Sequence, residues 1–258
     1  MNELQAIELE LRGEEPWEVL HFHSVGSTMD EARARIAELH RGSWLLVVAD
    51  TQSAGRGRQG RGWSSESGGM YATIAFATTR PVGACSGLSL MVGVVACEVL
   101  AALGATLRLK WPNDLLDADG RKVGGILIEV AQHAEGAIVL VGIGLNVANP
   151  IALGEENRLY APGHLAVFAP YDTEPFRLAP LIAKQLRRCW HSFEREGLAP
   201  FVEPWKRLCS HIDSTIEVQT DQGTRRGRCC GVDSDGALLL EDNGRITRVV
   251  SGHVSSLG

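Results

Sequence analysis

The stretch from Leu45 to Ala77 reads LLVVADTQSAGRGRQGRGWSSESGGMYATIAFA. Its first five residues form an apolar run that is short enough for a buried strand, and Tyr71–Ala77 alternates weakly, as a second strand would. Between the two, residues 55–62 hold four glycines, three arginines and one glutamine. Glycine lets backbone N–H groups approach a ligand closely, and the planar guanidinium groups of arginine fit carboxylates and phosphates. The stretch therefore predicts two strands joined by a loop that suits an anionic ligand.

Taken alone, this loop has other interpretations. It lacks the G-K-[ST] ending of a P-loop and does not match the dinucleotide-binding G-x-G-x-x-G before a helix. It also fits a flexible solvated loop, or an RGG-like segment that stacks on single-stranded nucleic acid with Trp63 as the platform. The net charge of the chain, 25 − 31 = −6, argues against a surface that coats nucleic acid.

Helix and strand signals extend outward from this stretch. Thr28 with Glu31 three residues later predicts a capping box at a helix start, and Ser27 with Asp30 offers a competing frame. Residues 86–103 are apolar on nearly all sides over the length of a helix, which predicts a buried helix. Further strands are expected at Thr106–Lys110, Ile126–Val130 and Ile138–Ile143, a loop at 149–175, and an amphipathic helix at Leu178–Phe193.

The pattern of the chain changes after about Cys209. Short strand candidates are joined there by tight turns that each contain a glycine, which indicates a small antiparallel barrel. These candidates are Ile216–Thr220, Arg226–Val232, Ala237–Leu240 and Arg245–Val250. We therefore expect a large domain over residues 1–208 and a small barrel over residues 209–258.

The composition is that of a soluble globular protein. Hydrophobic residues make up 45% of the 258 residues and charged residues 22%, which excludes a disordered or fibrous chain. The acidic N-terminus lacks the regions of a signal peptide, and the most apolar stretch, Leu88–Cys97, is about half a membrane span. None of the six cysteines lies in a C-x-x-C pair or in a Cys/His group with zinc-ligand spacing. We therefore expect a cytoplasmic protein with reduced thiols and no membrane partner.

Three further segments carry reactive or polar side chains at predicted strand ends. Lys110-Trp-Pro-Asn-Asp114 offers a cation, an amide and a carboxylate, which suit a nucleotide phosphate, a base edge and Mg²⁺. Lys122-Val-Gly-Gly125 places a lysine before two glycines, and Gly142-Ile-Gly-Leu-Asn146 combines bare backbone with an asparagine. Each segment alone also fits plain structure: a core tryptophan with an Asn-Asp turn, a surface lysine before a bend, and a strand-ending asparagine.

In their order and spacing, the four segments closely resemble those of the biotin–protein ligases. The motifs are G-R-G-R-Q-G-R-G-W, K-W-P-N-D, K-V-G-G-I-L-I-E and G-I-G-L-N, and the resemblance runs from about Ser24 to Asn149. Residues 231–240 look like part of the small SH3-like barrel of this family. The resemblance implies an α/β (α+β) fold, with a mixed β-sheet and flanking helices in a large catalytic domain, followed by that barrel.

The resemblance implies an ATP-dependent ligase. Enzymes of this family use ATP and Mg²⁺ to convert biotin into biotinyl-5′-adenylate, release pyrophosphate, and pass biotin to one lysine of a biotin carboxyl carrier domain. The catalytic residues it implies are Arg58, Lys110 and Lys122. The residues it places around biotin are Ser27, Thr28, Met29, Gln52, Gly55, Arg56, Gly57, Arg58, Lys122, Gly124 and Gly125. Those it places around ATP or the adenylate are Arg61, Trp63, Lys110, Asn113, Asp114 and Asn146.

The resemblance also bears on partners. It implies biotin, ATP and the carrier domain of a biotin-dependent carboxylase, and it leaves a homodimer and the metal ligands open. Some relatives bind DNA through an N-terminal helix-turn-helix domain, but only about twenty residues precede the catalytic pattern here, so we expect no DNA binding. Because four glycines in eight residues are costly to order, we expect residues 55–64 to be mobile without ligand and to order over the adenylate.

Three competing functions are weighed against this one. A nucleic-acid-binding module built on the arginines and Trp63 leaves K-W-P-N-D unexplained. A lipoyl or octanoyl transferase of related fold is disfavoured by the glycine-arginine loop together with K-W-P-N-D. A non-catalytic biotin binder is disfavoured because Arg58, Asp114 and Lys122 are all present.

Overall fold

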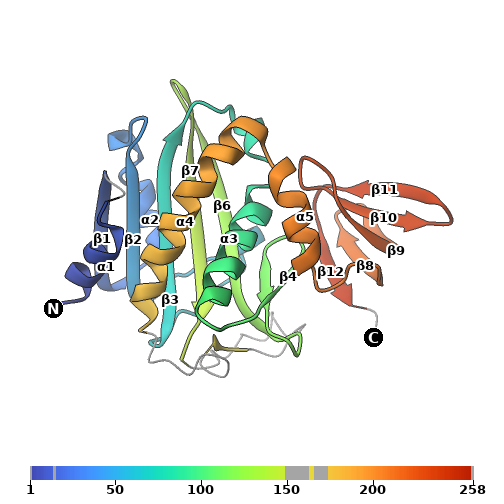
Figure 1. Cartoon of the computed structure of the whole chain (residues 1–258), viewed down its shortest axis with the longest axis horizontal. Helices are drawn as coiled ribbons and strands as arrows, with labels where there is room; N and C mark the ends of the chain where they lie inside the picture. The colour runs from blue at the N-terminus through green and yellow to red at the C-terminus, as the bar shows by residue number, and fades with distance from the viewer. Residues whose placement is uncertain (1, 14–15, 149–162, 166–173, 257–258) are drawn as a thin grey trace.

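The computed structural model describes residues 2–13, 16–148, 163–165 and 174–256. A seven-stranded sheet forms the large domain, in the order β1-β2-β3-β7-β6-β5-β4 (Figure 1). Its strands are β1 (Trp17–Val25), β2 (Trp44–Gln52), β3 (Gly69–Thr78), β4 (Arg108–Lys110), β5 (Asp114–Leu116), β6 (Lys122–His133) and β7 (Gly136–Asn146). Strands β1 and β2 run parallel and the other neighbouring pairs antiparallel, so the expected mixed sheet is confirmed.

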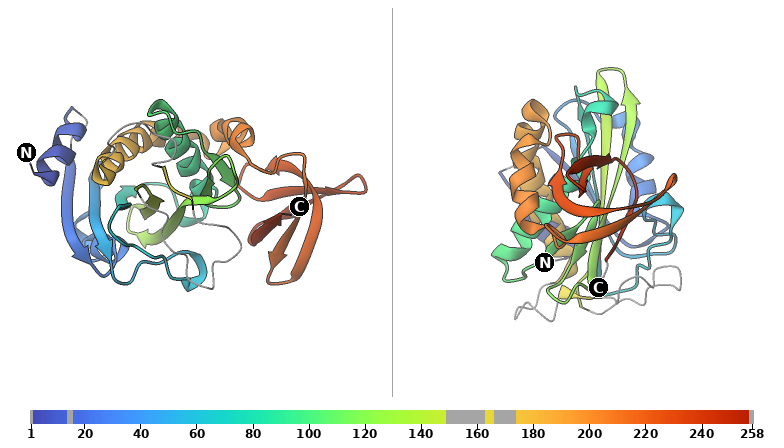
Figure 2. Two further views of the ribbon diagram at one scale, coloured as in Figure 1. Left: turned by 90° about the horizontal axis from the view of Figure 1, so that it is seen from below. Right: turned by 90° about the vertical axis from the view of Figure 1, so that its right-hand side faces the viewer.

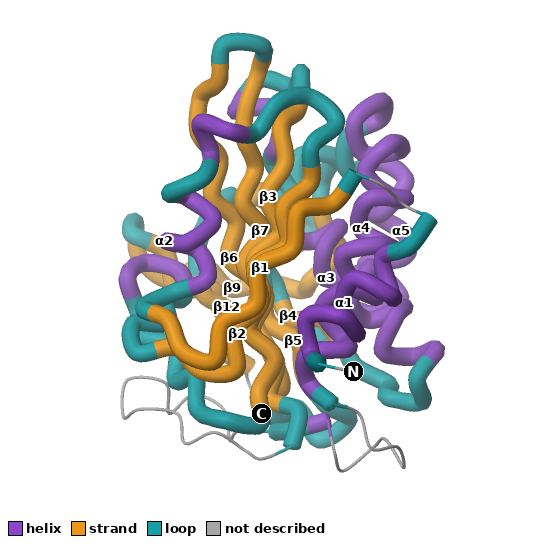
Figure 3. Tube along the Cα trace, turned by 90° about the vertical axis from the view of Figure 1, so that its left-hand side faces the viewer, coloured by secondary structure: helices purple, strands orange, loops and turns teal. Residues whose placement is uncertain are grey.

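Helices cover the two faces of this sheet unequally. One face carries a layer of four helices, whereas α2 lies on the opposite face (Figure 3). The four are α1 (Glu3–Leu11), α3 (Leu88–Ala102), α4 (Pro175–Glu196) and α5 (Ala199–Leu208); α2 spans Thr28–Arg33. Three short 3₁₀ turns, η1 (Ile36–Glu38), η2 (Arg58–Gly60) and η3 (Val82–Cys85), interrupt the connections.

Strand alternation explains how one apolar run serves both layers. In β2, Leu46 and Val48 join the large core beneath the four helices, whereas Leu45 and Val47 pack with α2. Successive side chains of a strand point to opposite faces of the sheet. The stretch Val82–Ala102 is long and apolar enough to cross a membrane by length and composition, but 61% of its most apolar window is buried inside the protein. In this fold α3 is therefore a core helix.

The C-terminal part forms a five-stranded antiparallel sheet in the order β11-β10-β9-β8-β12. Its strands are β8 (Thr215–Thr220), β9 (Gly223–Val232), β10 (Leu238–Asp242), β11 (Arg245–Val249) and β12 (His253–Ser256). Figure 2 shows this sheet curling at one end of the molecule, beside α5. It agrees with the expected small barrel, and a division between residues 208 and 209 stays a prediction.

The start of α2 differs from the expected capping box. Ser27 occupies the N-cap position, but its side chain makes no capping hydrogen bond. Thr28 Oγ1 instead donates to Gln52 Oε1 at 3.1 Å, and the helix ends at Arg33. The competing frame therefore gives the right N-cap position, Ser27, whereas a capping box that starts at Thr28 is wrong, because a tertiary partner on β2 takes the Thr28 hydroxyl.

Several elements were not anticipated from the sequence, and one prediction cannot be compared. The unanticipated elements are α1, β1, β5, α5 and β12. The expected loop at 149–175 lies almost entirely outside the described residues.

Candidate active site

A pocket opens on the α2 side of the large sheet. The glycine-arginine loop, α2, and the starts or ends of several strands surround it. Among the expected site residues, it is lined by Ser27, Thr28, Met29, Gln52, Arg56, Gly57, Arg58, Arg61, Trp63, Asn113, Asp114, Lys122 and Gly125. The lining also includes Gly62, Gly142 and Gly144, which belong to the glycine-bearing segments of the sequence analysis, and residues that were not expected there: Ala72, Ile126, Leu127, Ile143 and His253. Segments from both ends of the chain thus meet at one cavity.

Four residues that were expected at the site do not line the pocket. Asn146 Nδ2 donates to the backbone oxygen of Gly163 at 3.0 Å. Gly55 has no room for a side chain, because a Cβ there would lie 2.4 Å from the Trp63 carbonyl oxygen. Gly124 is packed just as closely, since its Cβ would lie 2.8 Å from the carbonyl oxygen of a neighbouring β7 residue. The fourth is Lys110, a buried residue of β4.

Bare glycine backbone forms part of the pocket floor. A Cβ at Gly144 would lie 2.6 Å from Nε1 of Trp63, and a Cβ at Gly142 would lie 3.0 Å from Sδ of Met29. The indole ring therefore lies directly on the backbone of β7. The ammonium group of Lys122 lies 5.3 Å from the centre of the same ring, within cation–π range. Trp63 and Lys122 thus form a flat, cationic wall.

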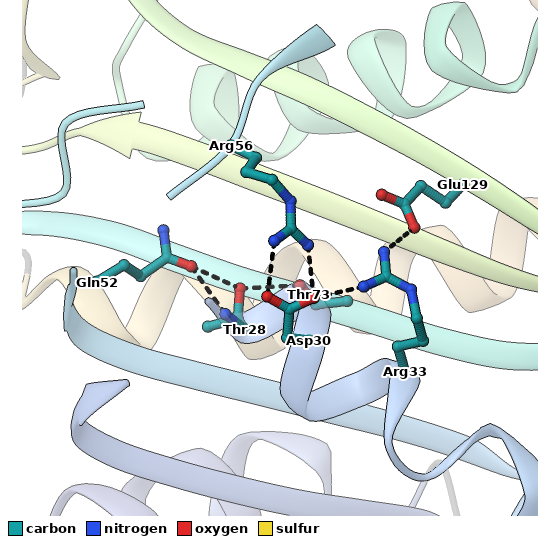
Figure 4. Close-up of polar contacts among 7 residues, drawn as sticks. All are labelled: Thr28, Asp30, Arg33, Gln52, Arg56, Thr73 and Glu129. Atoms are coloured by element: carbon teal, nitrogen blue, oxygen red, sulfur yellow. Dashed lines mark hydrogen bonds and ion pairs between the residues drawn. The ribbon is translucent and has the colours of Figure 1, made fainter. Parts of the chain in front are cut away.

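A chain of hydrogen bonds fixes the other wall (Figure 4). The amide oxygen of Gln52 accepts from both the backbone N–H and the hydroxyl of Thr28, at 2.8 and 3.1 Å. Thr73 donates to the Thr28 hydroxyl at 2.9 Å, and Gln52 Nε2 donates to Ser65 Oγ at 2.8 Å. Because each polar group is oriented by the next, this wall is already arranged to hold a polar part of a ligand.

Ion pairs tie the glycine-arginine loop to α2. The guanidinium of Arg56 donates to both carboxylate oxygens of Asp30, at 2.7 and 2.6 Å (Figure 4). Arg33 pairs with the same carboxylate and with Glu129 on β6. The hydrogen bond from Arg56 is the main reason that the pKa of Asp30 lies below its ordinary value. Three segments distant in sequence are thereby held together beside the pocket, which Arg56 lines.

The loop itself is folded back on its own backbone. Gly57 N–H donates to the Arg61 carbonyl at 2.7 Å, and Trp63 N–H donates to the Gly55 carbonyl at 2.9 Å. Gln59 occupies the left-handed region, with φ of 58°. The loop therefore has a defined closed shape, and its expected mobility without ligand stays a prediction.

The part of the pocket that Arg58, Asp114 and Lys122 line is strongly charged. Lys122 Nζ lies 2.6 Å from Oδ1 of Asp114, and Lys110 Nζ lies 3.9 Å from Oδ2 of the same carboxylate. Burial lowers the pKa of Lys110 to about 7, although Asp114 opposes the shift. Burial likewise lowers the pKa of Arg58, whose guanidinium donates to Asn113 Oδ1 at 3.5 Å. Desolvated cations at one end of a cavity are suited to a phosphate or carboxylate ligand.

The segment from Lys110 to Asp114 has both structural and pocket-facing members. Trp111 is buried and donates from Nε1 to the Gly236 carbonyl at 3.0 Å, so it joins the large domain to the C-terminal sheet. Asn113 instead lines the pocket, and its Nδ2 donates to the Ile126 carbonyl at 2.8 Å. The core interpretation of the tryptophan is therefore confirmed, whereas ligand binding by Asn113 and Asp114 stays a prediction.

His253 is a polar pocket residue that the sequence did not reveal. It begins β12 of the C-terminal sheet and reaches the charged end of the pocket. Its Nε2 is buried and has no hydrogen-bond partner among the described residues. Burial, with Lys110 as the next cause, lowers the pKa of His253 to about 4, so the ring is neutral at pH 7. No local sequence signal marks this histidine, because only the docking of the C-terminal sheet brings it there.

Comparisons with known proteins support the resemblance that the four sequence motifs indicated. The model of the biotin/lipoate A/B protein ligase family matches residues 21–146. The bifunctional ligase/repressor BirA of Escherichia coli is 35% identical over 234 residues, which cover 90% of this chain and 71% of that protein. The biotin–[acetyl-CoA-carboxylase] ligase of Mycobacterium tuberculosis is 39% identical over 240 residues, with 90% and 86% covered.

The fold is shared with solved structures. The biotin protein ligase from Aquifex aeolicus, solved in complex with biotin and ATP, superposes with a TM-score of 0.74 at 25% identity, covering 92% of this chain and 97% of the other. The match spans both the large sheet and the C-terminal sheet. The chain therefore belongs to the biotin–protein ligase family of enzymes.

Proposed function

We propose that this chain joins the carboxylate of biotin to the α-phosphate of ATP, releasing pyrophosphate, and then transfers biotin from biotinyl-5′-adenylate to a lysine of a biotin carboxyl carrier domain. The observation that carries the proposal is the meeting of Arg58 and Lys122, from separate segments, at one charged end of the pocket. Apolar side chains such as Met29 and Leu127 line the same pocket, as an aliphatic acid requires.

The cations answer the main electrostatic difficulty of the first step. A carboxylate that attacks a phosphate brings like charges together, and two unit charges at about 4 Å repel by roughly 4 kcal/mol at an effective dielectric of about 20. Left uncompensated, this costs about a thousandfold in rate. Arg58 and Lys122 are fixed by Asn113 and Asp114 before any ligand arrives, so they can stabilise developing charge without reorganising.

The two ends of the pocket suit the two substrates. We assign the Thr28–Gln52 wall and the loop backbone to biotin, whose uncharged polar groups need donors and acceptors rather than charges. We assign Asn113, Lys110 and the Trp63 ring to the nucleotide. His253 joins the nucleotide side because it lies at the charged end.

Mg²⁺ is consistent with the groups present. Asp114 supplies a carboxylate at the charged end, and Mg²⁺ is commonly held by one or two carboxylates together with substrate phosphates. When bound, the ion would supply charge neutralisation of the triphosphate. Lys110 and Lys122 hold the Asp114 side chain in place until then.

The proposal also covers the acceptor protein, the cellular compartment and the role of the C-terminal sheet. We take the acceptor to be the carrier domain of a biotin-dependent carboxylase, because the Mycobacterium tuberculosis relative is named a ligase of biotin to acetyl-CoA carboxylase. All six cysteines are free, as expected in the cytoplasm. The C-terminal sheet belongs to the domain that we place at residues 209–258, and it completes the nucleotide end of the pocket through His253.

Exchange of labelled pyrophosphate into ATP tests the first step. The reaction should require biotin and should not occur with lipoate or without an acid. Exchange that depends on lipoate would instead establish the second candidate function, a lipoyl ligase, which the shared family model also covers. No exchange with either acid would overturn the proposal. Transfer is then measured as biotin on a purified carrier domain, with the acceptor lysine replaced by arginine as the control.

A further inference from the structure

Two cysteines and a histidine form a buried cluster at the joint between the large domain and the C-terminal sheet. Cys209, His211 and Cys229 each offer one ligand atom, and these three atoms lie within 4.8 Å of one another. Their exposed fractions are 3%, 6% and 0%. The cluster is separate from the pocket lining, so it has no part in the substrate contacts described above.

The donor set suits a thiophilic divalent cation. Zn²⁺ binds thiolate sulfur at about 2.3 Å, so two sulfurs on one tetrahedral ion lie about 3.8 Å apart. The spacing within the cluster needs only a small inward movement to reach that geometry. No fourth Cys, His or carboxylate of the described residues joins the group, which leaves the fourth position for a water molecule.

The side chain of His211 has a buried ring nitrogen that it can offer to a metal ion. Its Nδ1 lies 3.2 Å from Ser210 Oγ, and its Nε2 is buried with no hydrogen-bond partner among the described residues. When Nδ1 donates to the serine, the lone pair of Nε2 is available, as in metal sites where the second ring nitrogen orients the first.

The charge balance of the cluster also suits a cation. One divalent ion with two thiolates and a neutral imidazole carries no net charge. Such a site therefore adds no repulsion against Lys110, which is buried nearby.

The position of the cluster gives a bound ion a mechanical effect. Cys209 forms an isolated β-bridge with Leu109 of β4, and the N–H of Ser210 donates to the Leu109 carbonyl at 2.8 Å. Cys229 lies on β9 of the C-terminal sheet. An ion held by both cysteines would cross-link the sheet that carries His253 to the strand that carries Lys110.

We propose that Cys209, His211 and Cys229 form a binding site for one zinc-class divalent cation that fastens the C-terminal sheet to the large domain. This inference rests on the cluster alone and does not depend on the biotin chemistry.

Cobalt provides the direct test. Reduced, chelator-treated full-length protein is titrated with Co²⁺, which should give an equimolar tetrahedral spectrum with a thiolate-to-cobalt band, and Zn²⁺ should then displace it. Cys229→Ser should weaken binding by more than about a hundredfold. Cys230→Ser is the matched control, since this neighbour on β9 is outside the cluster and should keep full binding.

A second measurement on the wild-type protein guards against variants that fail to fold. Zn²⁺ should slow alkylation of Cys209 and Cys229, read by mass spectrometry, and leave the alkylation of Cys230 unchanged. It should also raise the melting temperature. A six-coordinate cobalt spectrum, or equal alkylation of the two cluster cysteines with and without Zn²⁺, overturns the proposal. Pyrophosphate exchange measured in parallel shows whether the active site is intact in either case.

Discussion

Arg56 and Asp30 lie 26 positions apart in the chain, yet the guanidinium of Arg56 donates hydrogen bonds to both carboxylate oxygens of Asp30, at 2.7 and 2.6 Å. This two-point contact ties the glycine-arginine loop to the first turn of α2. Arg33, which belongs to α2 itself, pairs with the same carboxylate and helps to hold it in place. An otherwise glycine-rich segment thereby gains a specific attachment to α2 that depends on Asp30.

Asp30→Asn should therefore release the loop without unfolding the protein. Both partners are substantially exposed, and exposed ion pairs contribute only about 0–1 kcal/mol to global stability. Limited proteolysis should cleave residues 55–64 several times faster in the variant, while the melting temperature changes little. Glu31→Gln is the control, because Glu31 pairs with Arg35 and not with the loop. Equal cleavage rates in Asp30→Asn and wild type would contradict the anchoring role.

Nucleotide binding should draw a proton onto Lys110. Its pKa is lowered from 10.5 to about 7 by burial, so at pH 8 the folded protein holds it mostly neutral. A bound triphosphate favours the ammonium form, so binding at pH 8 should take up as much as about one proton. Calorimetry in two buffers of different ionisation enthalpy measures this uptake. Lys110→Met should abolish it, and Lys206→Met on α5 should not.

The same shift has a consequence for stability. Between pH 7 and pH 10.5 the unfolded chain binds the Lys110 proton and the folded chain does not, so this group's contribution to stability rises with pH across that window. Below pH 7 the destabilising contribution is complete. Lys110→Met should flatten this part of the pH dependence in denaturant titrations. A variant whose curve stays parallel to wild type would show that Lys110 is not desolvated.

Arg58→Gly should weaken retention of the adenylate. The guanidinium is largely desolvated, and a hydrogen bond to a charged group contributes about 1.5–3 kcal/mol, so the dissociation rate of biotinyl-5′-adenylate should rise by roughly 10- to 100-fold. Gln59→Gly is the matched control. It adds a glycine to the same loop, but at an exposed position whose φ of 58° glycine adopts readily. If both variants release the adenylate at the same rate, the effect belongs to loop flexibility and not to Arg58.

The local pattern of apolar residues was sufficient to predict the central strands and the longest helices. The apolar run in β2 and the apolar stretch of α3 are buried because their composition leaves no other stable position. Polar contacts were less predictable. Thr28 offered a local cap, yet its hydroxyl donates to Gln52 on strand β2. A single sequence does not show whether such a hydroxyl bonds to the local backbone or to a distant side chain.

Cys209, Cys229 and His253 could not be placed from the sequence, because the packing of the C-terminal sheet against the rest of the chain brings them to their positions. Cys209 and Cys229 lie twenty positions apart, with no metal-binding spacing, and meet only because β9 lies against the end of α5. His253 likewise depends on the docking of a whole sheet. By contrast, Asn113, Asp114 and Lys122 were predictable because they lie at the ends of strands, where side chains leave the core.

His253→Ala should impair use of ATP and spare biotin. The neutral ring offers one donor and one acceptor at the charged end of the pocket, and loss of one hydrogen bond costs about 0.5–1.5 kcal/mol, so KM for ATP should rise by as much as about tenfold. Biotin binding, measured without nucleotide, should be unchanged. His253→Asn should recover part of the loss, because its amide also offers a donor and an acceptor.

A control on the same strand separates this contact from the docking of the C-terminal sheet. Ser255→Ala removes a side chain of β12 whose hydroxyl bonds within the sheet, to the Glu217 carbonyl at 3.3 Å. If β12 acts only by supporting the structure of the pocket, both variants should raise KM for ATP by similar factors and lower the melting temperature. If the imidazole itself meets the nucleotide, only His253→Ala raises KM, and the two melting temperatures stay close to that of the wild type. Equal KM values in His253→Ala and wild type would exclude the contact.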